Sequence, residues 1–268
     1  VVCQRRFFIL LEKENIFIIN EKQLSAEQEK FVKNYFEQEV HPCLVPIMLN
    51  SHPSFPYLKN AVIYLAIHLS YKGNHSKPAY ALIEVPANIL PRFIVLPKID
   101  DRKFIIMLDD IIRYGLKDIF SIFEFDSHQA YTIKLTRDAE LEIDDDVTRS
   151  FFEKISDSVK QRQMGQPVRF VYDREILADL FNFILKRNRL QDFQNLIPGG
   201  RYHNARDFMN FPKIGSAALV NKPRAPLYHK DLVKSKSIFS VLKEKDVLLH
   251  YPYQSFHHII DLLREAAI

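Results

Sequence analysis

The sequence predicts an α+β fold in which helices pack against a mixed β-sheet. Two stretches indicate the sheet. From Tyr131 to Ile143 apolar and polar residues alternate, which is the period of a half-buried strand. Residues 61–71 are apolar in both phases, as expected for a central strand that is covered on both faces. Stretches of helical period lie between and after these strands, and together the patterns predict the α+β class.

The first half of the chain contributes several of the expected strands. An apolar opening at residues 7–20 precedes a helix at residues 25–40, where Ser25 and Gln28 are placed as a capping box. Three further elements follow the central strand, and prolines end the two strands among them: strands at 79–86 and 92–97, and a helix at 107–120.

The second half adds two helices and a strand. The acidic triplet at residues 144–146 precedes a helix that ends near Gly165, and we interpret the triplet as a helix cap rather than a metal site. A strand at 168–173 ends in Asp173, which is expected to cap a helix at 174–188.

A looser, proline-rich region spans residues 196–228. A new unit is expected from about Asp231, and residues 237–267 are expected to form a helix, a short strand, a turn and a second helix. The chain begins without Met and ends inside this last helix, so we expect it to be a piece of a longer protein.

The composition is that of a folded protein with one large domain or two smaller ones. Of the 268 residues, 47% are hydrophobic and 26% charged. The net charge of +4 is a mild excess that suits a polyanionic partner but is too small for a nucleic-acid-binding tail. The two cysteines suggest no disulfide framework, and the most apolar run, residues 61–69, is too short to span a membrane.

Familiar catalytic motifs are missing from the sequence. It contains no P-loop, no dinucleotide-binding glycine motif, no paired-histidine zinc motif and no nucleophile elbow. A kinase with this sequence would therefore need another way to hold phosphate. The ten histidines are scattered, and the adjacent pair, His257 and His258, would point about 100° apart on a helix.

One loop has features of an anion site. PGGRYHN, residues 198–204, places two glycines and Arg201 before Asn204, a candidate helix N-cap. Exposed backbone N–H groups and a fixed cation can hold phosphate, although two glycines before a capped helix are also ordinary turn chemistry. Lys222 and Arg224 follow in an extended stretch and can add a basic rim.

Arg137 breaks the alternation of the strand because it occupies an apolar phase. An unpaired buried guanidinium is costly, so a partner is expected. One alternative is a carboxylate, such as Asp138, Glu140 or an acidic residue of another element, in a bidentate pair. The other is that the arginine projects from this strand end toward a cleft or a binding partner.

Five ordered motifs carry a resemblance to a known family. The chain is similar to polyphosphate kinases of the histidine-autophosphorylating type, and the resemblance covers nearly the whole sequence. The motifs are TRDAE (136–140), PVRFVY (167–172), PGGRYHN (198–204), VNKP (220–223) and DVLLHYPY (246–253).

The resemblance implies three segments. Residues 1–20 would be the tail of a helical N-terminal domain, and residues 21–230 the middle domain. Residues 231–268 would begin a first catalytic domain resembling phospholipase D. The phosphorylated histidine of the family, its magnesium-associated arginines and its nucleotide-contacting residues would lie outside this sequence, and His250, His257 and His258 do not match the nucleophile.

The activity implied by the resemblance is the reversible transfer of the ATP γ-phosphate to polyphosphate through a phosphohistidine. It implies ATP, ADP, polyphosphate and Mg²⁺ as ligands of the parent enzyme. It also implies a cytoplasmic homo-oligomer, such as a dimer, that can associate peripherally with membranes and has no nucleic-acid partner. This segment would be inactive by itself and would serve assembly and the polyphosphate path. The candidate polyphosphate-binding residues are Arg137, Arg201, His203 and Lys222.

Two alternatives stay open at this point. The segment can be a purely structural module that holds the N-terminal domain and the dimer partner. It can also be a general polyanion- or RNA-binding domain, although no RNP-like aromatic motif or strongly basic stripe supports that reading.

Overall fold

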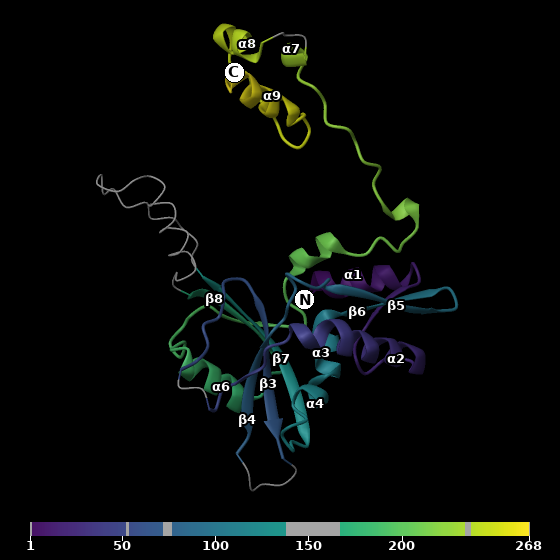
Figure 1. The fold of residues 1–268 in the computed structure, drawn as a ribbon, viewed down its shortest axis with the longest axis vertical. Coiled ribbons are helices and arrows are strands. Elements are labelled where there is room, and N and C mark those ends of the chain that lie inside the picture. The colour runs from purple at the N-terminus through teal and green to yellow at the C-terminus, as the bar shows by residue number, and fades with distance from the viewer. Residues whose placement is uncertain (1, 52–53, 72–76, 138–166, 234–236, 268) are drawn as a thin grey trace, which may run out of the picture. The chain divides into compact units, whose positions relative to one another are not determined.

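The computed structural model describes residues 2–51, 54–71, 77–137, 167–233 and 237–267 (Figure 1). The chain forms two compact units, Val1–Gly215 and Ser216–Ile268. All strands among the described residues lie in the first unit, whereas the described part of the second contains short helices joined by loops.

The first unit contains two mixed β-sheets. The smaller has the order β1 (Ile16–Ile19), β6 (Arg102–Met107), β5 (Phe93–Ile99). The larger has the order β2 (Ile47–Met48), β4 (Ala79–Glu84), β3 (Ile63–Ser70), β7 (Ser127–Arg137), β8 (Pro167–Asp173), β9 (Leu196–Gly199). The pairs β1–β6 and β8–β9 are parallel and the others antiparallel. The predicted α+β class is confirmed, with the strands divided between two sheets.

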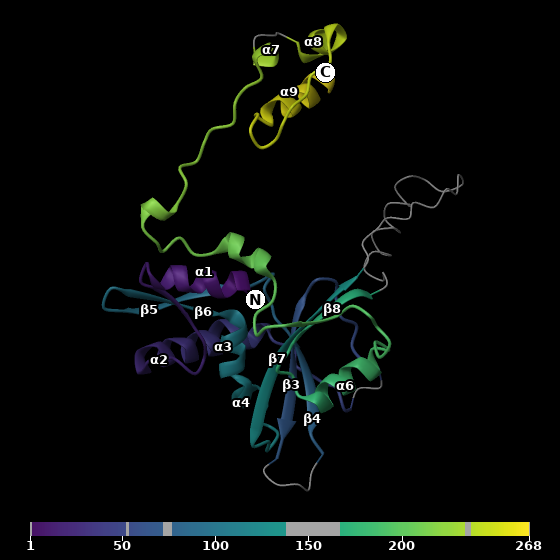
Figure 2. The ribbon, with the colours of Figure 1, turned by 180° about the vertical axis from the view of Figure 1, so that it is seen from behind.

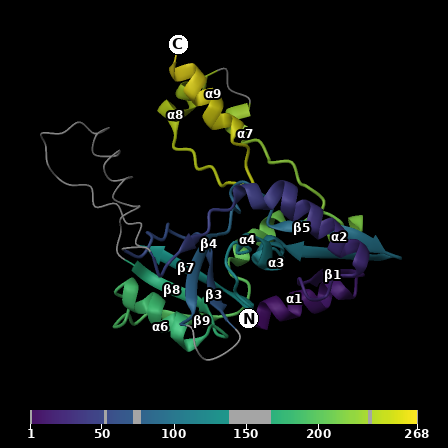
Figure 3. The same cartoon turned by 60° about the horizontal axis from the view of Figure 1, so that its bottom comes forward.

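The central strand β3 is buried on both faces, as the sequence predicts. Leu65 and Ile67 enter one hydrophobic core, whereas Tyr64 and Ala66 enter the other. Figures 2 and 3 show the helices that supply the opposite walls of these cores. They are α2 (Ala26–Tyr35) and α3 (Leu108–Tyr114) for the first core, and α6 (Ala178–Arg187) for the second.

The helix starts and breaks follow from local chemistry. Gln28 N donates to Ser25 Oγ (3.3 Å) and Ser25 N donates to Gln28 Oε1 (3.2 Å), so the predicted capping box of α2 is confirmed. The helix predicted at residues 107–120 is divided at Gly115 into α3 and α4 (Leu116–Ile119). A Cβ at Gly115 would come within 2.1 Å of the Phe36 ring, so this close approach requires glycine.

Two strands depart from their predicted bounds. β5 continues past Pro97 to Ile99 through a register shift, because Pro97 lies where the ladder with β6 is irregular. β7 begins at Ser127 rather than Tyr131, and its described part ends at Arg137. Residues 138–143 of the predicted strand lie outside the described residues.

The prediction that Asp173 caps a helix is wrong. α6 begins at Ala178, and Asp173 Oδ1 instead accepts the backbone N–H of Glu175 (3.2 Å) in a turn that closes β8. The acidic triplet at 144–146 and the helix predicted after it lie outside the described residues.

A helix, α1 (Val2–Glu12), precedes β1. Its Leu11 packs against a third, smaller core that includes Phe93. The loop after β9 contributes Phe208, Phe211 and Ile214 to that core.

The second unit contains α7 (Lys230–Val233), α8 (Ile238–Glu244) and α9 (His257–Ala266). No strand lies between α8 and α9 in its described part, which corrects the sequence prediction; Gln254 instead forms an isolated bridge with Leu227. His258 Nε2 accepts the backbone N–H of His229 (2.9 Å). In the described parts of both units, none of the helices has the length and apolar character needed to cross a membrane. The domain boundaries at residues 20 and 230 stay predictions.

Candidate functional site

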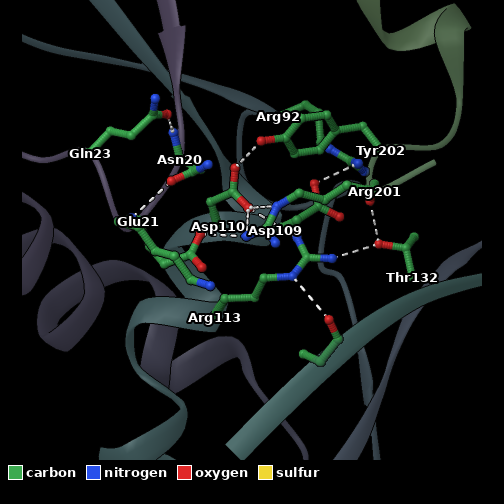
Figure 4. A network of polar contacts seen from close by, with 12 residues as sticks. Asn20, Glu21, Gln23, Arg92, Asp109, Asp110, Arg113, Thr132, Arg201 and Tyr202 are labelled. Atoms are coloured by element: carbon green, nitrogen blue, oxygen red, sulfur yellow. Dashed lines mark hydrogen bonds and ion pairs between the residues drawn. The ribbon is translucent and has the colours of Figure 1, made fainter. Parts of the chain in front are cut away.

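The polar centre of the first unit is built around Asp110. This residue lies in the first turn of α3 and is fully buried. Its Oδ1 accepts N–H groups from Arg113 (3.0 Å) and from Arg201 Nη2 (2.7 Å) and Nε (3.0 Å). Its Oδ2 accepts the hydroxyl of Tyr202 (2.6 Å), so both carboxylate oxygens are occupied (Figure 4).

Arg113 connects this carboxylate to the larger sheet. It is buried, and besides its bond to Asp110 its Nη2 donates to Thr132 Oγ1 (2.8 Å) and its Nε to the carbonyl of Ala130 (3.3 Å). The Thr132 hydroxyl in turn donates to the carbonyl of Arg201 (2.7 Å). β7 is therefore linked to both α3 and the loop after β9.

Arg201 brings the loop after β9 against the smaller sheet. Its guanidinium also pairs with Glu21, the second residue after the end of β1. Burial acts to lower the pKa of Arg201, but the neighbouring carboxylates of Asp110 and Glu21 raise it overall. Burial and the Asp110 carboxylate raise the pKa of Tyr202, which therefore acts as a neutral hydrogen-bond donor.

A second buried ion pair lies beside the first. Arg92 Nη2 is 2.6 Å from Asp109 Oδ2, and Arg92 Nη1 is 3.5 Å from Asp207 Oδ2. Burial raises the pKa of Asp207, although Arg92 acts in the opposite direction. Asp207 belongs to the same loop as Arg201, so this pair attaches that loop a second time.

The carboxylates of this buried cluster outnumber its guanidinium groups. Three guanidinium groups face four carboxylates, and each guanidinium lies within 4 Å of at least one carboxylate. The cluster therefore offers no surplus cation to an anionic ligand. Its members are Glu21, Arg92, Asp109, Asp110, Arg113, Arg201 and Asp207.

An open pocket of about 290 Å³ borders the cluster. Its lining includes Arg113 and Arg201 and also the acidic residues Asp173 and Glu175. The lining carries both signs of charge, which does not select for an anion.

Comparison with known proteins relates this architecture to one family. The polyphosphate kinase middle domain matches residues 27–211, and polyphosphate kinase C-terminal domain 1 matches residues 237–268. The chain belongs to the polyphosphate kinase family.

Similar proteins carry the same name. The polyphosphate kinase of Vibrio parahaemolyticus is 41% identical over 261 residues, which cover 96% of this chain and 37% of that protein. The polyphosphate kinase of Escherichia coli K12 is 40% identical over 267 residues, 97% of this chain and 38% of that protein. A crystal structure of polyphosphate kinase from Porphyromonas gingivalis matches with a TM-score of 0.72 and 26% identity, over 98% of this chain and 37% of that one. The chain thus spans less than two fifths of the length of these polyphosphate kinases.

The candidate residues of the PGGRYHN motif lie inside the first unit. His203 is buried beside Gly199, where a Cβ would come within 2.8 Å of His203 Nε2. Burial lowers the pKa of His203 to about 4, so the imidazole is neutral near pH 7. Asn204 precedes a short 3₁₀ helix, Ala205–Asn210, but its side chain makes no capping hydrogen bond, which corrects the expected N-cap. It donates instead to Asp207 Oδ1 (2.6 Å).

Arg137 lies at the described end of β7. Its backbone N–H donates to Asn60 Oδ1 (2.9 Å) and its Nε donates to the carbonyl of Leu58 (3.2 Å). Its guanidinium carbon lies 4.4 Å from the centre of the Tyr57 ring. A carbonyl and an aromatic face are thus among its contacts. The carboxylate pair and the polyphosphate contact both stay predictions.

Lys222 belongs to the second unit, whereas the other three candidates belong to the first. It is exposed, and it makes no hydrogen bond or ion pair with another described residue. Its role in polyphosphate binding stays a prediction.

Sequence reasoning missed the central members of the cluster. Arg92, Asp110 and Arg113 were assigned only to a strand and a helix, because their partners come from other elements. One signal was present: Asp110 and Arg113 are three residues apart on a helix, and opposite charges at that spacing face each other.

Proposed function

We propose that this chain is part of a polyphosphate kinase that reversibly transfers the γ-phosphate of ATP to polyphosphate through a phosphohistidine. Three findings support the proposal: the shared name of the relatives, their identity of about two residues in five, and the match to two consecutive domains of the family. The phosphohistidine and the residues that contact ATP and ADP would belong to parts of the enzyme outside these 268 residues.

Within that enzyme, the first unit would serve assembly rather than chemistry. The observation that carries this proposal is the complete occupation of Asp110 by Arg113, Arg201 and Tyr202. A general base needs an accessible lone pair, and an anion site needs an available cation. Asp110 and the guanidinium groups bound to it offer neither, and their hydrogen bonds join α3, β7, the loop after β1 and the loop after β9.

Mg²⁺ would be held elsewhere in the enzyme. In the described ranges, no group of three His, Cys, Asp or Glu side chains is placed to bind a metal ion. When bound, Mg²⁺ would neutralise the phosphate charge during transfer. The residues of this chain would contribute to that step only by fixing the position of other parts of the enzyme.

The assembled enzyme is proposed to be a cytoplasmic homo-oligomer that can associate peripherally with membranes. These proposals derive from the resemblance to the family. Light scattering of the longer protein would test the oligomer, and sedimentation with lipid vesicles would test the membrane association.

The proposed division of labour has a direct test. Purified chain is incubated with ATP, Mg²⁺ and a polyphosphate primer, and ADP is measured. We expect no ADP above a heat-denatured control, because the phosphohistidine and the nucleotide-contacting residues would lie outside this segment and the sequence contains no P-loop. Sustained turnover, or a phosphohistidine at His250, His257 or His258, would show that the catalytic groups lie within the chain.

A further inference from the structure

The positive charge excess of the chain is concentrated in one segment. Residues 208–230, which we call the acid-free segment, contain four basic residues and no Asp or Glu. Without these four, the chain would have 33 Lys and Arg against its 33 Asp and Glu, so the segment accounts for the whole formal charge of +4. The four are Lys213, Lys222, Arg224 and Lys230.

These four cations are exposed, in contrast to the arginines of the buried cluster. Every residue from 215 to 228 is exposed, as are Lys213 and Lys230. None of the four lies within 4 Å of a carboxylate in the part of the chain that the structure describes. Arg201 has two such carboxylates and Arg92 has two. The segment therefore offers the unneutralised charge that the buried cluster lacks.

The backbone around two of these cations is held extended. Residues 222–226 read Lys-Pro-Arg-Ala-Pro, so Lys222 and Ala225 each precede a proline. A proline has a restricted φ, and the residue before it favours an extended conformation. No helix or strand occupies residues 220–226. Leu227 anchors the end of this stretch, because its N–H donates to Tyr253 O (2.8 Å) and its carbonyl accepts Ser255 N–H (2.8 Å).

A chain that is already extended loses little conformational freedom when it binds. Lys222 and Arg224 are two residues apart, a spacing that separates Cα atoms by about 6–7 Å along an extended backbone. Their neighbours lack secondary-structure bonds, so backbone N–H groups are available beside them as further donors. This arrangement suits a ligand that is itself linear and presents negative charge at short, regular intervals.

We propose that the acid-free segment binds inorganic polyphosphate through Lys222 and Arg224, with Lys230 as an outer contact. The choice of polyphosphate as the ligand rests on the function proposed above. Arg and Lys both bind phosphate oxygens strongly, and a polymer of phosphates needs no base-stacking surface. The only exposed aromatic side chain of the described segment is Tyr228, which disfavours single-stranded nucleic acid as the ligand.

The test is a binding measurement with the 268-residue chain and end-labelled polyphosphate of defined length at several NaCl concentrations. The double variant K222Q/R224Q removes two charges from the segment. K30Q/K33Q removes two exposed charges from α2 and is the matched control. We expect the first variant to weaken binding about tenfold or more and to reduce the dependence of log K on log salt, whereas the control changes affinity less than about twofold.

Unfolding curves should be unchanged in both variants, because the four substituted side chains are exposed. The proposal is overturned if the wild-type chain does not bind polyphosphate, or if the two variants lose affinity equally. It is also overturned if single-stranded RNA binds as tightly as polyphosphate, which would indicate a general polyanion surface. Catalysis is not part of this readout, so a negative result leaves the proposed reaction standing. Failure of the longer enzyme to make polyphosphate, with binding intact, would count against the reaction alone.

Discussion

Substituting Asp110 with Asn is the sharpest perturbation of the buried cluster. The change keeps the shape of the side chain and one acceptor oxygen but removes its charge. Arg113 then keeps neutral acceptors such as Thr132 and the Ala130 carbonyl but loses its carboxylate, whereas Arg201 still has Glu21. Because Arg113 is buried, its charge would be left without a carboxylate in a medium that solvates it poorly.

Removing one partner of a buried ion pair typically costs about 3–5 kcal/mol. For a unit of this size, 1 kcal/mol corresponds to about 2–4 °C, so we expect the melting temperature to fall by about 6–20 °C. Thermal unfolding followed by near-UV circular dichroism would measure it. Asp118→Asn, an exposed change of the same kind on α4, is the control and should shift the midpoint by less than about 2 °C.

The reasoning also predicts coupling between Asp110 and Arg113. If the loss comes from an unpaired guanidinium, Asp110→Asn combined with Arg113→Gln should cost less than the sum of the two single changes. Additive effects, or a midpoint for Asp110→Asn that matches the Asp118 control, would refute the view that this carboxylate neutralises buried charge.

Three further predictions concern packing, the strand end and pH. Gly115→Ala should lower the free energy of unfolding by about 1–3 kcal/mol, because its Cβ would overlap the Phe36 ring, whereas Gly200→Ala, which meets nothing within 4 Å, should be nearly neutral in urea titrations. Arg137→Lys should cost about 1–3 kcal/mol if its planar group is structural; unchanged stability with weaker polyphosphate binding would favour the functional alternative. The pKa of His203 is lowered to about 4, so its contribution to stability is present above pH 6.5 and is lost as pH falls from 6.5 toward 4. Melting curves of His203→Gln should therefore depend less on pH in that window than those of the wild type.

Local patterns predicted much of the fold. The two-phase apolar run of β3 and the capping box at Ser25 depend on neighbours within a few residues, and both were confirmed. Asp173 shows the limit of such reasoning. Its carboxylate can cap a helix or close a turn with equal chemistry, and the turn forms because α6 begins only at Ala178.

The buried cluster could not be predicted in the same way. Arg201 lies 91 residues from Asp110 and 180 from Glu21, and no periodicity relates such positions. The sequence showed Arg201 beside two glycines, a setting that suits phosphate and internal ion pairs equally. Only the arrival of two carboxylates from other elements distinguishes these outcomes.

The cations of this protein divide into two populations according to the carboxylates around them. A buried guanidinium that loses its partner is destabilising, so Arg92, Arg113 and Arg201 constrain where α3 and the loop after β9 can lie. A displaced apolar contact can repack at small cost, but a displaced ion pair cannot, which makes the cluster more demanding of one arrangement than the cores around it. The acid-free segment follows directly from the loop that this cluster holds. Along the chain, the ion pairs of Arg201 and Asp207 hold the loop, and exposed cations without neighbouring carboxylates come next. This order is expected when one part of a chain fixes the position of a loop and the next part binds a polyanion.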